Sequence, residues 1–163
     1  MTTVQSRQAR TRRRFDSLEQ EVFLGLWRAY DRLRVLEEEL FGKYDLTPQQ
    51  YNALRLLRSS HPETIQTLDL ASRLVSRAPD ITRLLDKLEQ RGLVARYRPA
   101  DDRRVVRIGI TDEGLALLRA LRDPVRQCHA RQLGHLSRSE LQRLRASLRA
   151  ARRPHEDASS SWT

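Results

Sequence analysis

The sequence predicts a mainly α-helical fold with one small β-hairpin. Apolar residues recur every three or four positions over most of the 163 residues, as they do on one face of a helix. Helix-capping patterns, such as Thr-Pro-Gln-Gln at 47–50, separate these periodic segments. The period shortens to two only between residues 93 and 110, which indicates a pair of β-strands.

The first two predicted helices differ in length. The first is long, about residues 12–42, because apolar residues at steps of three or four continue from Phe15 to Leu40. The second begins after the capping box and ends near Ser60.

Two shorter helices come next. One spans about residues 67–75, where Thr67 is expected to cap the helix and Leu68 to face inward. The other spans about 78–91 and stops at Gly92, a residue suited to the position just past a helix end.

The hairpin follows this fourth helix. Its strands are predicted over 93–98 and 104–110, with a Pro-Ala-Asp-Asp turn between them. Thr111 is expected to cap the next helix, which Pro124 should bend or interrupt.

The last helix opens with a capping box at 137–140, and residues 154–163 are predicted to be an unstructured tail. Its inward positions are predicted to be Leu141, Leu144, Leu148 and Ala151. Terminal helices with apolar seams need a partner surface. We therefore expect one domain, 1–163, with helical dimerisation arms at about 12–42 and 111–152 around a central lobe at about 46–110.

The net charge of the chain indicates which class of binding partner it favours. Lys and Arg number 31 against 21 Asp and Glu, a formal net charge of +10 at pH 7. Such a balance favours nucleic acid first and an anionic membrane surface second. No apolar run approaches the roughly 20 residues of a membrane-spanning helix, and the single Cys128 can form no intramolecular disulfide. We expect a cytoplasmic protein with double-stranded DNA, not a membrane, as its partner.

The order of the central elements predicts a DNA-reading module. Three short helices followed by a two-stranded wing form a winged helix-turn-helix, whose last helix enters the major groove. Helical spacing leaves Arg83 and Lys87 one turn apart on the outer face of that helix. This pair suits a recognition helix, although a solvated helix face with two basic residues has the same pattern.

The hairpin is unusually basic. Residues 91–107 hold six arginines against two aspartates, a density that a merely solvated loop rarely needs. A tip carrying Arg103 and Arg104 could reach a minor groove, where narrow A·T tracts concentrate negative potential. Asp102 is expected to pair with Arg104 and hold its guanidinium extended.

Several short stretches of the chain together carry a pattern of residues typical of one protein family. They are LTPQQY at 46–51, Leu-Ala at 70–71, DITRLLDKLEQRGLV at 80–94, DRR at 102–104 and ITDEG at 110–114. Together they resemble the MarR family of transcriptional regulators over about residues 20–150. The resemblance implies a homodimer joined through its first and last helices, with two winged lobes on a near-palindromic operator, usually acting as a repressor.

The resemblance also implies site residues. Thr82 and Arg83 match the family's DNA-contacting pair, and Asp102 and Arg104 match its wing-tip pair. The full set predicted to bind DNA is Thr67, Arg77, Asp80, Thr82, Arg83, Lys87, Arg103 and Arg104, with Asp102 supporting the wing. Asp80 departs from the common pattern, and its carboxylate could accept a cytosine amino group or stabilise the first turn of the helix.

MarR-like proteins commonly respond to phenolic or aromatic carboxylate ligands, which implies a small aromatic effector. Trp27, Tyr30 and Tyr44 could line its pocket, with Arg32 holding an anionic group. Aromatic residues at helical spacing also suit a protein core.

The sequence predicts no catalysis, metal or cofactor. It has no glycine-rich phosphate loop, nucleophile elbow or HExxH motif. Cys128 lies on an apolar seam, which favours a buried thiol over a redox sensor. The alternative function is a helical dimer whose winged domain binds a ligand or a protein without specific DNA binding, and such a module would lack salt-dependent duplex binding.

Overall fold

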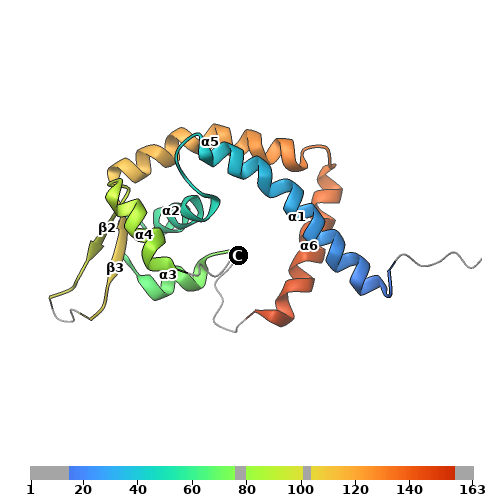
Figure 1. The fold of residues 1–163 in the computed structure, drawn as a ribbon, viewed down its shortest axis with the longest axis horizontal. Helices are drawn as coiled ribbons and strands as arrows, with labels where there is room; N and C mark the ends of the chain where they lie inside the picture. The colour runs from blue at the N-terminus through green and yellow to red at the C-terminus, as the bar shows by residue number, and fades with distance from the viewer. Residues whose placement is uncertain (1–14, 76–79, 101–103, 157–163) are drawn as a thin grey trace, which may run out of the picture. The chain divides into compact units, whose positions relative to one another are not determined.

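The computed structural model describes residues 15–75, 80–100 and 104–156 (Figure 1). The chain divides into two compact units, Met1–Val35 and Leu36–Thr163. The described part of the first unit consists mostly of α1 (Leu18–Gly42), a helix whose last turns belong to the second unit.

The helix α1 begins later than predicted. Residues 15–17 are not helical, and Ser17 caps the helix because its Oγ accepts the Gln20 N–H at 3.1 Å. Within the first unit most apolar side chains of α1 lie at the surface, with Leu18 70% and Trp27 61% exposed, and Leu33 is half-buried.

The second unit begins with the predicted helix order, in which α2 (Pro48–Ser60) is followed by α3 (Thr67–Arg73) and α4 (Ile81–Gln90). The predicted capping box of α2 is confirmed. Thr47 Oγ1 accepts the Gln50 N–H at 3.2 Å, and Gln50 Oε1 accepts the Thr47 N–H at 2.8 Å.

Two predictions about α3 are wrong. Thr67 is the first helical residue and not the cap, and its hydroxyl donates to the Val106 carbonyl at 3.3 Å. Leu68, which was expected to face inward, is 80% exposed, whereas Leu70 and Leu74 are buried. The backbone bond from Thr67 N–H to the same carbonyl ties the start of α3 to the wing and helps to set which face turns inward.

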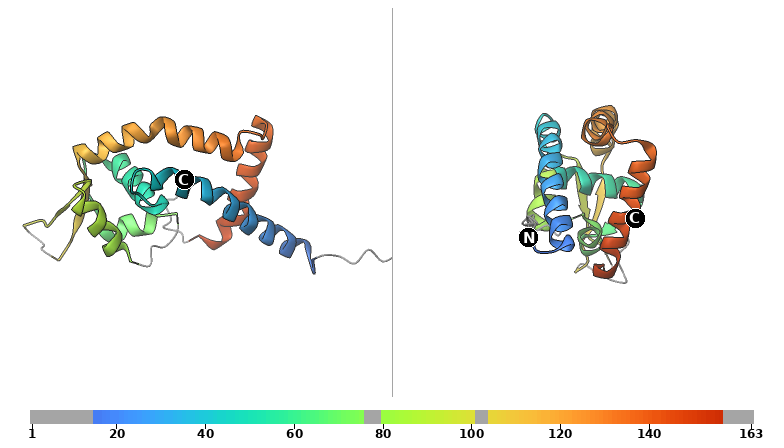
Figure 2. Two further views of the ribbon diagram at one scale, coloured as in Figure 1. Left: turned by 45° about the horizontal axis from the view of Figure 1, so that its top comes forward. Right: turned by 90° about the vertical axis from the view of Figure 1, so that its right-hand side faces the viewer.

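The sheet has three strands where two were predicted. The left view of Figure 2 shows the two strands of the hairpin side by side. The predicted hairpin is confirmed as β2 (Val94–Tyr97) and β3 (Arg107–Ile110), and β1 (Ile65–Gln66) pairs with the other edge of β3. All pairs are antiparallel, and Ile65 lies opposite Ile108. A strand of two residues is too short to show a period in the sequence, so β1 was missed.

Thr111 caps α5 (Asp112–Leu133) as predicted, because its Oγ1 accepts the Gly114 N–H at 3.1 Å. The helix does not stop at Pro124. It continues to Leu133 along a curved path in Figure 1, so the proline bends the helix without interrupting it.

The last helix, α6 (Arg138–Arg152), has the predicted capping box between Ser137 and Glu140. A short 3₁₀ helix, η1 (Arg153–His155), follows where the unstructured tail was expected to begin, and Glu156 forms an ion pair with α6. That start of the tail is therefore wrong, and residues 157–163 lie outside the described part.

The core of the second unit is built by α2, α4, α5 and the sheet. Leu54, Leu85 and Leu121 are fully buried there. The end of α1 joins this core through Phe41, whose ring stacks on Tyr51 of α2 with 4.5 Å between the ring centroids.

The apolar face of α6 is not buried within the described chain, contrary to the inward direction predicted for it. Leu144 and Leu148 are 36% and 40% exposed, and Ala151 is exposed as well, whereas Leu141 is half-buried. No helix among the described residues is both long enough and apolar enough to cross a membrane.

Candidate nucleic-acid interface

The outer face of α4 is the one that the sequence predicted. Leu84 and Leu85 are buried against the core, whereas Thr82, Arg83 and Lys87 are exposed. Arg83 and Lys87 are four residues apart and therefore lie about one helical turn from each other. This face presents one hydroxyl group and two cations to solvent.

Asp80 caps α4. Its Oδ1 accepts the backbone N–H of Arg83 at 2.9 Å, which satisfies one of the donors that a helix start leaves unpaired. The stabilising interpretation of Asp80 therefore has a structural basis, and contact between Asp80 and a base stays a prediction.

Three of the hairpin arginines in the described residues, Arg91, Arg96 and Arg107, bind identified parts of the protein. Arg91 donates to the backbone carbonyl of Tyr44 at 3.0 Å and to that of the next residue. Arg107 donates from Nε to Thr64 Oγ1 at 2.8 Å and from Nη2 to the Thr64 carbonyl. The third is Arg96. The arginine density of the hairpin, which a solvated loop rarely needs, is thus partly structural.

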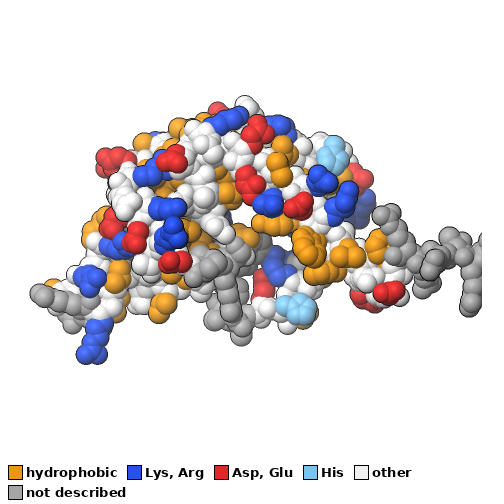
Figure 3. Space-filling view, in the orientation of Figure 1, with side chains coloured by type: hydrophobic (Ala, Val, Ile, Leu, Met, Phe, Trp, Pro, Cys, Tyr) orange, Lys and Arg blue, Asp and Glu red, His pale blue; other side chains and the backbone are white. Residues whose placement is uncertain are grey.

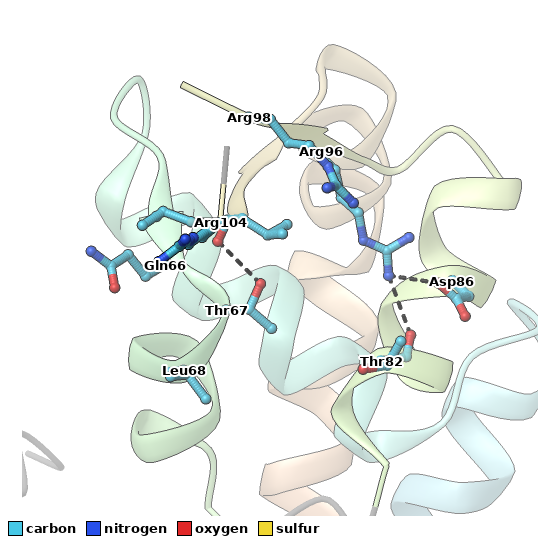
Figure 4. Close-up of a pocket in the computed structure, with 10 residues that line it drawn as sticks. Gln66, Thr67, Leu68, Thr82, Asp86, Arg96, Arg98 and Arg104 are labelled. Carbon is cyan, nitrogen blue, oxygen red and sulfur yellow. Dashed lines mark hydrogen bonds and ion pairs between the residues drawn. The ribbon is translucent and has the colours of Figure 1, made fainter. Parts of the chain in front are cut away.

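Arg96 joins the wing to α4 (Figure 4). Its guanidinium forms ion pairs with Asp86, at 2.6 Å, and with Glu89, and donates to the Thr82 carbonyl at 3.3 Å. Partial burial alone would lower the pKa of Arg96, but hydrogen bonds to Asp86 and Glu89 outweigh it and raise the pKa above its ordinary value. The contact pairs one cation with two acidic side chains of α4 and so offsets part of their negative charge.

A depression of about 520 Å³ lies between the start of α3, the outer face of α4 and the wing. Its lining includes Gln66, Leu68, Thr82, Arg98 and Arg104. Arg98 and Arg104 are exposed, and Figure 3 shows Lys and Arg side chains over the wing. The structure therefore brings a residue of α4 and basic residues of the wing to one concave surface.

Sequence reasoning missed three of these lining residues. Gln66 belongs to the unrecognised strand β1, and Arg98 was not distinguished from the other hairpin arginines. Leu68 was assigned to the core. The pair Leu70 and Leu74 could have corrected this, because Leu68 lies roughly 200° around the helix from Leu70.

The other predicted DNA-binding residues divide into two groups. Thr67 lines the depression, but its hydroxyl is bonded to the wing. Arg77, Asp102 and Arg103 lie outside the described residues, so the pairing of Asp102 with Arg104 stays a prediction.

The predicted effector residues belong to different units. Trp27, Tyr30 and Arg32 are exposed in the first unit, where the Trp27 ring meets Phe23 edge-on at 6.4 Å. Tyr44 belongs to the second unit and packs against its core. A pocket shared by these residues stays a prediction.

In the part of the chain that the structure describes, no group of three or more His, Cys, Asp or Glu side chains is placed to hold a metal ion. Cys128 is buried in α5, as its apolar surroundings in the sequence indicated.

A helix-turn-helix, an exposed basic recognition face and a basic wing define the winged-helix class of DNA-binding regulators. Comparison with known proteins gives the family. The MarR family model matches residues 46–106. The HTH-type transcriptional regulator FarR of Neisseria gonorrhoeae is 31% identical over 102 residues, which are 63% of this chain and 68% of that protein. This chain belongs to the MarR family of transcriptional regulators.

Solved structures agree with this assignment. A MarR transcription factor from Planctomyces limnophilus is 56% identical, with a TM-score of 0.67, and the match covers 84% of this chain and 99% of that one. The MepR–DNA complex of S. aureus is 25% identical, with a TM-score of 0.70, and covers 79% of this chain and 95% of MepR.

Proposed function

We propose that this protein is a homodimeric repressor that binds a near-palindromic operator in double-stranded DNA and is released by a small aromatic effector. The observation that carries the proposal is the shared surface of α4 and the wing. Thr82 of α4 and Arg98 and Arg104 of the wing line one depression, and the nearby acidic side chains Asp86 and Glu89 are held by Arg96.

Each part of this surface suits a different part of the duplex. The first turn of α4 enters the major groove, where Thr82 and Arg83 meet base edges. Lys87, one turn further along, meets a backbone phosphate. Arg104 extends the contact from the wing to the neighbouring minor groove.

Dimerisation is supported by the apolar side chains that α1 and α6 carry at the surface, because helices with such faces are stable when a partner covers them. A dimer with a two-fold axis presents two copies of α4. The half-sites should therefore lie about one helical turn of DNA apart, roughly 34 Å, or a small multiple of that distance.

The test begins with selection of bound duplexes from a random-sequence library by the purified full-length protein. Affinities for the selected duplex and for an unrelated one are then measured between 50 and 200 mM salt. A dimer with six to ten phosphate contacts should lose roughly 10³- to 10⁵-fold in affinity over this range. A ligand- or protein-binding module would select no duplex, and that outcome would refute the proposal.

Variants assign the roles within the surface. Arg83→Ala should cost about 1–3 kcal/mol on the selected duplex and little on the unrelated one, because it removes a base contact. Lys87→Ala should weaken binding to both duplexes alike. Arg126→Ala is the matched control, since it removes a cation from the exposed side of α5, where Arg126 pairs with Asp123 at 3.1 Å. It should leave both affinities nearly unchanged.

A further inference from the structure

The connection between α4 and the wing is short and turns sharply. Only residues 91–93 separate α4 from β2, and Gly92 takes a positive φ of 68°. The Gly92 N–H bonds to the Glu89 carbonyl at 2.8 Å, and the Leu93 N–H bonds to the Leu88 carbonyl at 3.0 Å. The wing therefore leaves α4 at a glycine pivot, and contacts beyond this pivot set its direction.

Arg96 makes such contacts from the third residue of β2. Besides its ion pairs with Asp86 and Glu89 and its bond to the Thr82 carbonyl, its backbone N–H donates to Glu89 Oε1 at 3.3 Å. The acceptors extend from Thr82 to Glu89, seven residues or about two helical turns. One side chain thus braces the wing against most of the length of α4.

We propose that Arg96 is a positioning residue that fixes the wing at the angle to α4 at which both reach the same duplex. This inference rests on the proposed DNA-binding function. A guanidinium suits the task because its planar fork spreads five donors over three nitrogens and can reach two carboxylates and a carbonyl at separate places, whereas the three donors of an ammonium group all leave one nitrogen. A wing that is already oriented loses less conformational freedom when it binds.

The same contacts allow a simpler explanation, in which Arg96 only cancels the charges of Asp86 and Glu89 near the DNA. The two explanations differ for the triple variant Arg96→Gln/Asp86→Asn/Glu89→Gln, which has no acidic charge to cancel and no brace. Charge cancellation predicts that the triple variant binds at least as tightly as wild type, because the net charge of these three residues rises from −1 to 0. Positioning predicts that it binds as weakly as Arg96→Gln.

The affinity test compares Arg96→Gln with Arg107→Gln. Both remove one cation from the same sheet, but the Arg107 side chain bonds Thr64 and not α4. Arg96→Gln should weaken binding to the selected duplex by about tenfold more than Arg107→Gln does. The further loss caused by Arg104→Ala should also shrink from about tenfold in wild type to about twofold in the Arg96→Gln background, because a free wing already contributes little. Equal losses for both glutamine variants, or an unchanged effect of Arg104→Ala, would overturn the proposal.

A second measurement needs no DNA. Spin labels at Gln90→Cys and Ala100→Cys, in a Cys128→Ala background, report the distance between the end of α4 and the wing. Arg96→Gln should broaden this distance distribution, and Arg107→Gln should not. If the wild-type protein binds no duplex, the proposed function fails, yet the labels still decide whether Arg96 orients the wing.

Folding is checked by circular dichroism for every variant. If Arg96→Gln does not fold, Arg96→Lys takes its place, because it keeps the charge and loses the fork. A broadened distance distribution and weaker binding are then expected, whereas an Arg96→Lys protein with wild-type affinity and a wild-type distribution would refute the positioning role.

Discussion

Replacing Gly114 by alanine should have two opposing effects on the stability of the protein. Gly114 is the third residue of α5, and a helix normally gains up to about 1 kcal/mol when glycine becomes alanine. A Cβ at this position, however, would lie 2.7 Å from Ile110 Cγ1 and closer still to the backbone carbonyl oxygen of Leu93. The close approach of α5 to the root of the wing leaves no space for a methyl group.

The clash should outweigh the gain in helix propensity, so the variant should be less stable than wild type. Overpacking of this kind typically costs about 1–3 kcal/mol, and here the backbone of Leu93, between α4 and β2, would have to move, since a backbone carbonyl cannot rotate away like a side-chain end. After subtraction of the helix-propensity gain, Gly114→Ala should lower the free energy of unfolding by about 1–2 kcal/mol. For a chain of this size that is a fall in Tm of roughly 2–8 °C.

Denaturant unfolding at a fixed protomer concentration measures the effect, because dimerisation would otherwise add to the apparent stability. Gly42→Ala is the matched control: Gly42 ends α1, and a Cβ there meets no atom within 4 Å. The control should be neutral or slightly stabilised. A Gly114→Ala protein as stable as wild type would show that the packing at the root of the wing is looser than described.

Three further expectations concern the helices. Leu85→Ala should lower the free energy of unfolding by about 2–5 kcal/mol, because Leu85 is fully buried. Leu68→Ala should change it by under about 0.5 kcal/mol, because Leu68 is exposed. Similar losses for the two variants in urea unfolding would contradict the exposure of Leu68. Ser137→Ala should destabilise α6 by about 1 kcal/mol at pH 7. Hydrogen bonds from the Ser137 hydroxyl and N–H lower the pKa of Glu140, so their contribution to stability is fully present above the ordinary carboxyl pKa and is lost as the pH falls through the lowered pKa. The difference in stability between Ser137→Ala and wild type should therefore narrow in acid. A difference that stays constant as the pH falls would refute this. Burial, and then the charge of a nearby glutamate, raises the pKa of the Cys128 thiol, so iodoacetamide at pH 7.5 should label it far more slowly than in denaturant, and equal labelling by mass spectrometry would disprove its burial.

Features that depend on neighbours in sequence were predictable. The capping boxes at Thr47 and Ser137 and the cap at Thr111 follow from side chains within three residues of a helix start. The exposed face of α4 follows from helical spacing alone. The inward direction predicted for Leu68 was wrong. Helical spacing puts Leu68 on the opposite side from Leu70, but a seven-residue helix offers few apolar positions to show which side is buried, and its tie to the wing lies outside the local sequence.

The candidate site was predictable to the level of its elements but not of its individual bonds. The sequence marks the hairpin as rich in arginine, yet Arg107 bonds a residue 43 positions earlier and Arg91 a residue 47 positions earlier. Which arginines are available to bind DNA therefore depends on partners that are distant in the sequence. Composition could not separate Arg98, which is exposed at the depression, from Arg96, whose guanidinium pairs with Asp86 and Glu89.

The internal bonds of Arg91, Arg96 and Arg107 have a consequence for ion release. A cation displaces condensed counterions from DNA only when it comes to a phosphate. These three guanidiniums already have oxygen partners within the protein, so the number of ions released per lobe should be smaller than the formal charge of the hairpin suggests. The slope of log affinity against log salt would then count the arginines that reach the DNA rather than those that build the wing.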